Sequence, residues 1–232
     1  MAERLGKTGA PIRPRLIIFD CDGVVADSET LANALLAESI SEIGTPTTIE
    51  DSICLFMGKR WQDTLAGIES WTGAPLPADF ETRHKARSRG RMRAEVGPIA
   101  GLTAFIAAHH ATPRCIASSS SPEWLNHCVD AFELRPHFGA NLFSATAVAR
   151  GKPAPDIFLH AADRMGHDPA DCLVLEDSIS GVLGARAAGM TVIGFLGGSH
   201  IRPGHAARLV EAGAHHVAAD YGEVSRLIAE AG

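Results

Sequence analysis

The chain has 232 residues, of which 46% are hydrophobic and 21% charged, and its formal net charge is -6 at neutral pH. This composition is that of an ordinary globular protein and excludes a disordered or fibrous chain. The negative charge argues against nucleic acid as a partner, because binding to a phosphate backbone needs an excess of clustered basic residues. No 18 consecutive apolar residues occur and no apolar run follows the charged N-terminal segment, so we expect a cytoplasmic protein without a membrane partner.

Short apolar runs predict the buried strands of a sheet. They cover residues 16–19, 114–118, 141–145, 172–176 and 191–195. Helical patterns lie between most of them, over residues 123–132, 156–165 and 181–188. Strands that alternate with helices predict a parallel sheet covered on both faces, which is a doubly wound α/β fold.

The segment from residue 28 to residue 96 interrupts this alternation. It carries helical patterns over 31–43 and 53–71, the second broken near Gly58, but no convincing buried strand. We therefore expect a core domain of residues 1–27 and 97–232 and an inserted α-helical domain of residues 28–96. The basic stretch from Arg83 to Arg93 in this insert is either a solvated helix face or a cationic wall toward an anionic substrate.

Two carboxylates follow the first predicted strand. Asp20 and Asp22 are separated by one residue, and Gly23 comes next. In open parallel sheets ligands gather outside the carboxyl ends of the strands, so both acids can reach one site there. Their mutual repulsion needs a cation or a shared proton to offset it, while Gly23 lets the backbone turn close to an anion. A capped turn without a site is the structural alternative.

Polar residues also follow the later predicted strands. Ser118 and Ser119 end the second, where hydroxyl and backbone N–H groups suit a phosphate or a helix cap. Glu176 and Asp177 end the fourth, and oxygen ligands of this kind are those that Mg²⁺ prefers. Lys152 lies between two of the strands in a segment that two prolines restrict, where an ammonium group can neutralise negative oxygens.

Together these segments resemble the four sequence motifs of the haloacid dehalogenase superfamily, and the insert resembles the helical cap of its β-phosphoglucomutase-like branch. The resemblance implies a Rossmann-like core in which Asp20 is the nucleophile, Asp22 the acid and base, Ser118 and Lys152 the phosphoryl-binding groups, and Gly23 and Ser119 further substrate contacts. It implies that Mg²⁺ is bound by Asp20, Asp177 and the Asp22 carbonyl oxygen, with Glu176 as a direct or water-mediated ligand. In the cap it places Gly58, Lys59 and Arg60 in the substrate-specificity loop.

The function implied by the resemblance is hydrolysis of a small phosphorylated metabolite, a sugar, sugar-acid or polyol phosphate, through an aspartyl-phosphate. A β-phosphoglucomutase-like sugar phosphomutase is the alternative within the family. Two departures count against it, because this chain has Ala32 and Trp61 where those mutases carry His and Arg. A catalytically silent phosphometabolite-binding protein is the alternative of another class. We expect a monomer or a weak homo-oligomer.

Overall fold

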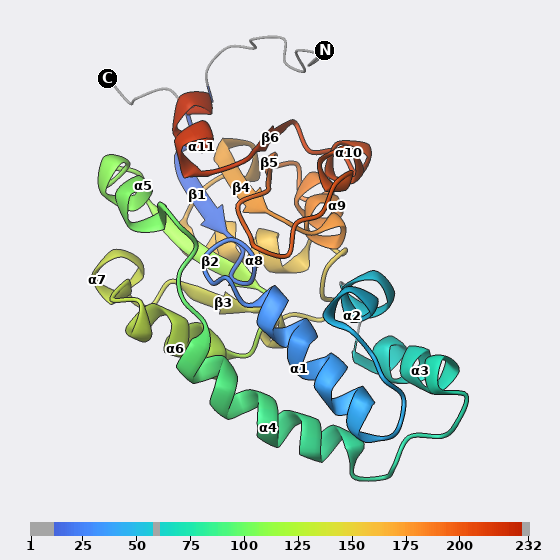
Figure 1. Ribbon diagram of the computed structural model, residues 1–232. Helices are drawn as coiled ribbons and strands as arrows, with labels where there is room; N and C mark the ends of the chain where they lie inside the picture. The colour runs from blue at the N-terminus through green and yellow to red at the C-terminus, as the bar shows by residue number, and fades with distance from the viewer. Residues whose placement is uncertain (1–11, 58–60, 229–232) are drawn as a thin grey trace. The chain divides into compact units, whose positions relative to one another are not determined.

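The computed structural model describes residues 12–57 and 61–228, and the chain separates into two compact units (Figure 1). The boundaries fall after Ala26 and after Gly97, so that Asp27–Gly97 forms the smaller unit. A backbone hydrogen bond from Asp27 N to Gly97 O, 3.0 Å long, joins the two ends of this unit. That the smaller unit acts as a cap stays a prediction.

The larger unit is built on a parallel sheet, as the sequence predicts. Its strands in the described part of the chain are β1 (Leu16–Phe19), β2 (Arg114–Ser118), β3 (Leu142–Ser144), β4 (Cys172–Glu176), β5 (Thr191–Phe195) and β6 (His216–Ala218). They lie in the order β3-β2-β1-β4-β5-β6, and every neighbouring pair is parallel. The order reverses between β1 and β4, and this switch point is where doubly wound sheets bind ligands.

The predicted strands agree with the structure except at one edge. The third strand is one residue shorter at each end than expected, and β6 is missing from the prediction. β6 has only three residues, and His216 and Val217 are half-buried, so no apolar run marks it. Edge strands bury less surface than central ones, and their pattern is correspondingly weak.

Helices cover both faces of the sheet. They are α5 (Leu102–Ala108), α6 (Pro122–Ala131), α7 (Arg135–Phe138), α8 (Asp156–Met165), α9 (Ile179–Ala187), α10 (His205–Glu211) and α11 (Tyr221–Leu227). On one face Leu16 and Ile18 of β1 join a core cluster with Phe158 of α8. On the other, Phe19 makes edge contacts with Phe105 of α5 and Phe138 of α7. Burial on both faces explains why the central strands are apolar throughout; β1 and β4 lie between α5 and α9 in Figure 1.

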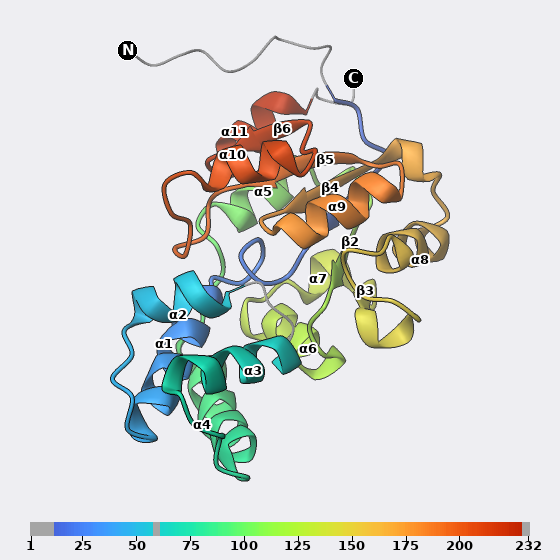
Figure 2. The same cartoon turned by 90° about the vertical axis from the view of Figure 1, so that its right-hand side faces the viewer.

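The smaller unit is helical over its described residues. It comprises α1 (Glu29–Glu42), α2 (Ile49–Phe56), α3 (Trp61–Thr72) and α4 (Phe80–Glu95), which Figure 2 shows from the side. Its buried core consists of Leu36, Ile40, Phe56, Ile68 and Phe80.

The basic stretch from Arg83 to Arg93 lies on α4. Arg83, Lys85, Arg87 and Arg91 each form an ion pair with an acidic side chain of the same unit. These pairs are largely exposed to solvent, which supports the interpretation of a solvated helix face.

Across residues 12–57 and 61–228, every helix is too short or too polar to span a membrane.

Candidate active site

The loop after β1 positions the first pair of carboxylates at the switch point. The backbone N–H of Asp20 donates to the carbonyl oxygen of Leu175 at 3.0 Å, so Asp20 is still held against β4. The chain then turns at Gly23, whose φ of 76° lies in the left-handed region. A Cβ at Gly23 would lie 1.8 Å from Asp177 Oδ2, so the absence of a side chain lets the Asp177 carboxylate pack against this loop.

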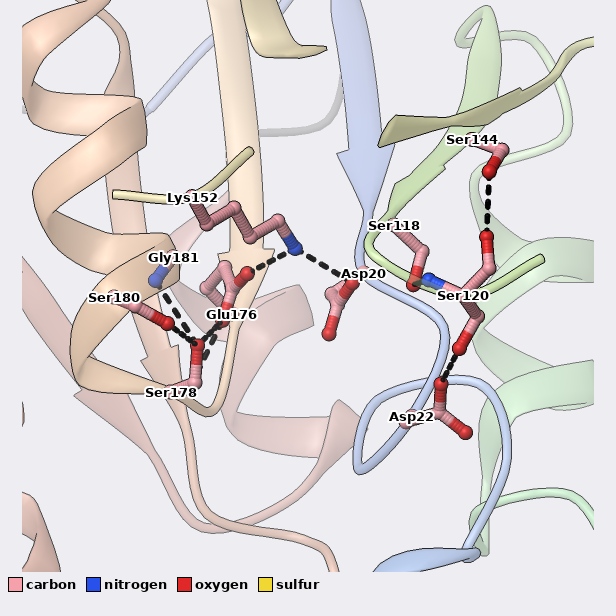
Figure 3. Close-up of polar contacts among 10 residues, drawn as sticks. All are labelled: Asp20, Asp22, Ser118, Ser120, Ser144, Lys152, Glu176, Ser178, Ser180 and Gly181. Atoms are coloured by element: carbon pink, nitrogen blue, oxygen red, sulfur yellow. Dashed lines mark hydrogen bonds and ion pairs between the residues drawn. The ribbon is translucent and has the colours of Figure 1, made fainter. Parts of the chain in front are cut away.

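Lys152 joins the carboxylates at the ends of the two central strands (Figure 3). Its Nζ lies 2.7 Å from Asp20 Oδ1 and 2.5 Å from Glu176 Oε1. The three side chains are at most 9% exposed. Burial opposes the charged form of Lys152, but the charges of Asp20 and Glu176 outweigh it and raise the pKa of Lys152 above its usual value. The ammonium group therefore stays charged beside Asp20.

Both oxygens of Glu176 already accept hydrogen bonds. Oε1 faces Lys152, and Oε2 accepts from the backbone N–H and the hydroxyl of Ser178, both at 2.9 Å. Ser178 also caps α9, because its Oγ accepts from Gly181 N at 3.0 Å (Figure 3). A Cβ at Gly181 would lie 1.7 Å from Glu176 Oε1. Helix α9 therefore encloses Glu176, and this carboxylate orients Lys152.

Asp20, Glu176 and Asp177 form a buried acidic cluster. Each offers one carboxylate oxygen, and these oxygens lie within 4.8 Å of one another. Burial, followed by the charges of Glu176 and Asp20, raises the pKa of Asp177 well above its usual value. Burial likewise raises the pKa of Glu176, although the charge of Lys152 opposes the effect. Three carboxylates lie near one ammonium group, so their full ionisation leaves a negative charge that a divalent cation can balance. The donor set fits such an ion.

Two histidines support Asp177, and the sequence analysis missed both. His200 Nε2 lies 3.0 Å from Asp177 Oδ2, and His205 Nε2 lies 2.6 Å from the main-chain oxygen of Asp177. Burial lowers the pKa of His205 below its usual value. His200 follows the carboxyl end of β5, so the rule that drew attention to polar residues after the other strands also points to it. His205, at the start of α10, carries no comparable signal.

Asp22 is held by two residues that follow β2. Its Oδ1 accepts from Trp124 Nε1 at 2.9 Å, and its Oδ2 accepts from the hydroxyl of Ser120. Ser118 is buried at the end of β2, and its Oγ accepts from Ser120 N at 3.2 Å. The neighbouring Ser119 is exposed. Ser120 thus contacts both Ser118 and Asp22, and Trp124 contacts Asp22 as well; the sequence analysis did not foresee these contacts.

The predicted substrate residues Gly58, Lys59 and Arg60 lie outside the described residues.

The fold and this cluster define an α/β enzyme with buried carboxylates and a lysine at the switch point of its sheet. The family model described as "Hydrolase: haloacid dehalogenase-like hydrolase" matches residues 14–189. The chain therefore belongs to the haloacid dehalogenase-like hydrolases, which confirms the predicted family and the prediction of a hydrolase.

Two curated relatives and one solved structure illustrate the relationship. The 6-phosphogluconate phosphatase of Escherichia coli (strain K12) is 28% identical over 193 residues, which cover 82% of this chain and 86% of that protein. Fructose-1-phosphate phosphatase YqaB of the same organism is 31% identical over 178 residues, 76% of this chain and 94% of that protein. The structure of ATU0790 from Agrobacterium tumefaciens, a haloacid dehalogenase-like protein of unknown function, has a TM-score of 0.85 at 39% identity and covers 92% of this chain and 96% of that one.

Proposed function

We propose that this protein is a magnesium-dependent phosphatase that hydrolyses a small phosphorylated metabolite through an aspartyl-phosphate on Asp20. The observation that carries the proposal is the cluster at the switch point. There Asp20 lies within 4.8 Å of Glu176 and Asp177, measured between ligand oxygens, and 2.7 Å from the Lys152 ammonium group. A carboxylate nucleophile, a cation site and a fixed positive charge are the groups that this chemistry needs.

Each residue of the cluster has a separate role in the proposal. Asp20, Asp177 and the carbonyl oxygen of Asp22 would hold Mg²⁺, and Glu176 would orient Lys152, with any contact to the ion as a secondary role. When bound, Mg²⁺ supplies charge neutralisation for the phosphate oxygens. Lys152 neutralises Asp20 and the phosphoryl group as they approach each other, and the Ser118 hydroxyl and nearby backbone N–H groups, those of Gly23 and Ser119 included, hold the phosphoryl oxygens.

The proposed reaction has two displacements. A carboxylate oxygen of Asp20 attacks phosphorus while the bond to the leaving oxygen breaks, and protonated Asp22 gives its proton to that oxygen. Asp22, now ionised, takes a proton from water, whose oxygen attacks phosphorus and releases Asp20. The products are the alcohol and inorganic phosphate, and both aspartates return to their starting states.

A sugar, sugar-acid or polyol phosphate is the proposed substrate class. The names of the relatives support it, since one acts on 6-phosphogluconate and another on fructose 1-phosphate. Substrate contacts of Gly58, Lys59 and Arg60 in a cap, a cytoplasmic location, a monomeric or weakly associated state and the absence of a nucleic-acid partner are further parts of the proposal.

Hydrolysis of p-nitrophenyl phosphate with MgCl₂ by the parent and by Asp20→Asn tests the proposal. We expect the substitution to lower the rate by at least ~10³-fold, because the nucleophile is lost. Mass spectrometry of acid-quenched parent enzyme should find one phosphoryl group on the peptide that contains Asp20. Equal rates for the two proteins would overturn the proposal.

A panel of sugar, sugar-acid and polyol phosphates then identifies the substrate. Release of inorganic phosphate supports a phosphatase, whereas an isomeric sugar phosphate without release identifies a mutase. Binding without either product identifies a silent binding protein.

A further inference from the structure

We propose that Ser120 and Trp124 are positioning residues for Asp22 in the acid–base steps of the proposed function, on which this inference rests. The observation is that each oxygen of the Asp22 carboxylate accepts a hydrogen bond from a different side chain. Trp124 Nε1 donates to Oδ1 at 2.9 Å, and the Ser120 hydroxyl donates to Oδ2.

The backbone around Ser120 is held on both sides, so its hydroxyl has a defined direction. Ser120 N donates to Ser118 Oγ at 3.2 Å, and Ser120 O accepts from Ser144 Oγ at 2.6 Å. Figure 3 shows the Ser120 hydroxyl pointing from this anchored loop toward Asp22. Strands β2 and β3 therefore both orient Ser120.

Trp124 is anchored by helix α6. Its backbone N–H donates to Ser121 Oγ, which caps the helix, at 3.3 Å. Its indole ring stacks on His127 one turn later, with ring centroids 5.5 Å apart. The indole N–H is thus directed at Asp22 Oδ1 by the first turn of a helix and not by a loose side chain.

The two partners differ in what they can do for a carboxyl group that gains and loses a proton. An indole N–H only donates, whereas a hydroxyl donates or accepts. Trp124 therefore keeps Oδ1 as the unprotonated oxygen in both states of Asp22. The proton resides on Oδ2, where Ser120 donates to the ionised carboxylate and accepts from the protonated acid, so that both states stay oriented.

The consequence is a dependence on the leaving group. In the first displacement the Oδ2 proton leaves its hydrogen bond to Ser120 and moves to the leaving oxygen as the bond from that oxygen to phosphorus breaks. An alkoxide needs this proton, but p-nitrophenolate leaves without it. The ratio kcat/KM reports on steps up to the loss of the leaving group, so it isolates this displacement from the later hydrolysis, which is common to all substrates.

The experiment compares kcat/KM for p-nitrophenyl phosphate and for the best alkyl phosphate of the panel. Trp124→Phe and Ser120→Ala should each lower the value for the alkyl phosphate by about tenfold, a part of the ~10²–10⁴-fold that general acid catalysis supplies. The value for p-nitrophenyl phosphate should change by less than about twofold, because its departure needs no acid. Ser120→Thr keeps the hydroxyl and should restore most of the loss. Trp71→Phe, a change of the same kind at an exposed tryptophan that donates to Thr47, is the matched control.

Equal losses for both substrates, or no loss for either, would overturn the proposal. A second measurement does not depend on catalysis: the chain has three tryptophans and so three indole N–H signals in a ¹H–¹⁵N spectrum. Trp124→Phe identifies one of them, and Asp22→Ala should shift that signal selectively; an unmoved signal would exclude the pairing. A parent without phosphatase activity would refute the proposed function, while this spectrum would still decide whether Trp124 holds Asp22.

Discussion

Lys152 is a buried cation between two carboxylates, and the cluster depends on it for charge balance. Lys152→Met leaves Asp20 and Glu176 without a counter-charge in a site where their side chains are 9% and 0% exposed. We expect the free energy of unfolding to fall by about 3 kcal/mol at pH 8 in the absence of Mg²⁺. Lys85→Met removes an exposed ion pair with Glu81 and should change the free energy of unfolding much less, because water already screens the two charges.

The loss of stability caused by Lys152→Met should be smaller at low pH than at high pH. Burial already raises the pKa of Glu176 in the parent, and loss of the Lys152 charge, which opposes that rise, raises it further in the variant, so the folded variant binds a proton more readily than the folded parent or the unfolded chain. The penalty of the charged carboxylate is full above this raised pKa and shrinks as the pH falls through it. Urea titrations of the variant and the parent at pH 8 and pH 5.5 should therefore differ less at the lower pH. A constant difference would contradict the assignment of the loss to unpaired charge.

His200 contacts Asp177, which is a proposed metal ligand. The distance from His200 Nε2 to Asp177 Oδ2 is 3.0 Å. His200→Asn should weaken Mg²⁺ binding by about tenfold, because partners of this kind hold the orientation of the ligand. The value of kcat at saturating Mg²⁺ should change much less. Calorimetric titration with MgCl₂ measures the first effect directly, with His110→Asn, an exposed histidine of the larger unit, as the control. An unchanged affinity would show that His200 serves packing alone.

The first turn of helix α9 encloses Glu176. Gly181 is helical, and replacement of a helical glycine by alanine normally stabilises a protein by up to about 1 kcal/mol. Here the added Cβ would lie 1.7 Å from Glu176 Oε1, so the buried carboxylate or the helix has to move.

We expect Gly181→Ala to destabilise the protein by about 2 kcal/mol and to lower phosphatase activity through the displaced Lys152. Gly90→Ala in α4 is the matched control, since a Cβ at Gly90 meets no atom within 4 Å. It should raise the free energy of unfolding by about 0.5 kcal/mol. Thermal and urea unfolding measure both variants, and two changes of the same sign would contradict the packing argument.

Metal binding to the acidic cluster would link the stability of the larger unit to the concentration of the ion. A ligand present at 100 times its dissociation constant stabilises the folded state by about 2.7 kcal/mol. For a chain of this length that corresponds to a rise in Tm of roughly 5–10 °C. We expect such a rise when EDTA is replaced by excess MgCl₂.

Asp177→Asn should separate the effect of the buried negative charge on stability from the effect of bound Mg²⁺. In EDTA the variant should be at least as stable as the parent at pH 8, because a carboxylate whose pKa burial raises is replaced by a neutral group. With MgCl₂ its Tm should stay constant, while Asp163→Asn, an exposed change on α8, should keep the full rise. A rise in Asp177→Asn equal to that of the parent would place the ion elsewhere.

The order and type of the main elements follow from local patterns in the amino-acid sequence. The runs at residues 16–19, 114–118 and 172–176 coincide with β1, β2 and β4, because strands buried on both faces carry an uninterrupted apolar pattern. The strand-end rule also predicts Asp20, Glu176 and Asp177 at one edge of the sheet. Whether these residues perform the roles that the family resemblance implies stays a prediction.

Which side chains contact one another depends on how the elements pack. Trp124 lies 102 residues from Asp22 in the chain, and neither its surroundings nor its spacing indicates the hydrogen bond that joins them. The same holds for the contact of His205 with the Asp177 carbonyl oxygen and for the enclosure of Glu176 by Gly181. Periodicity and strand ends are local properties of the sequence. A hydrogen bond requires the donor–acceptor distance to be set to within a few tenths of an ångström, and only the packed fold sets it.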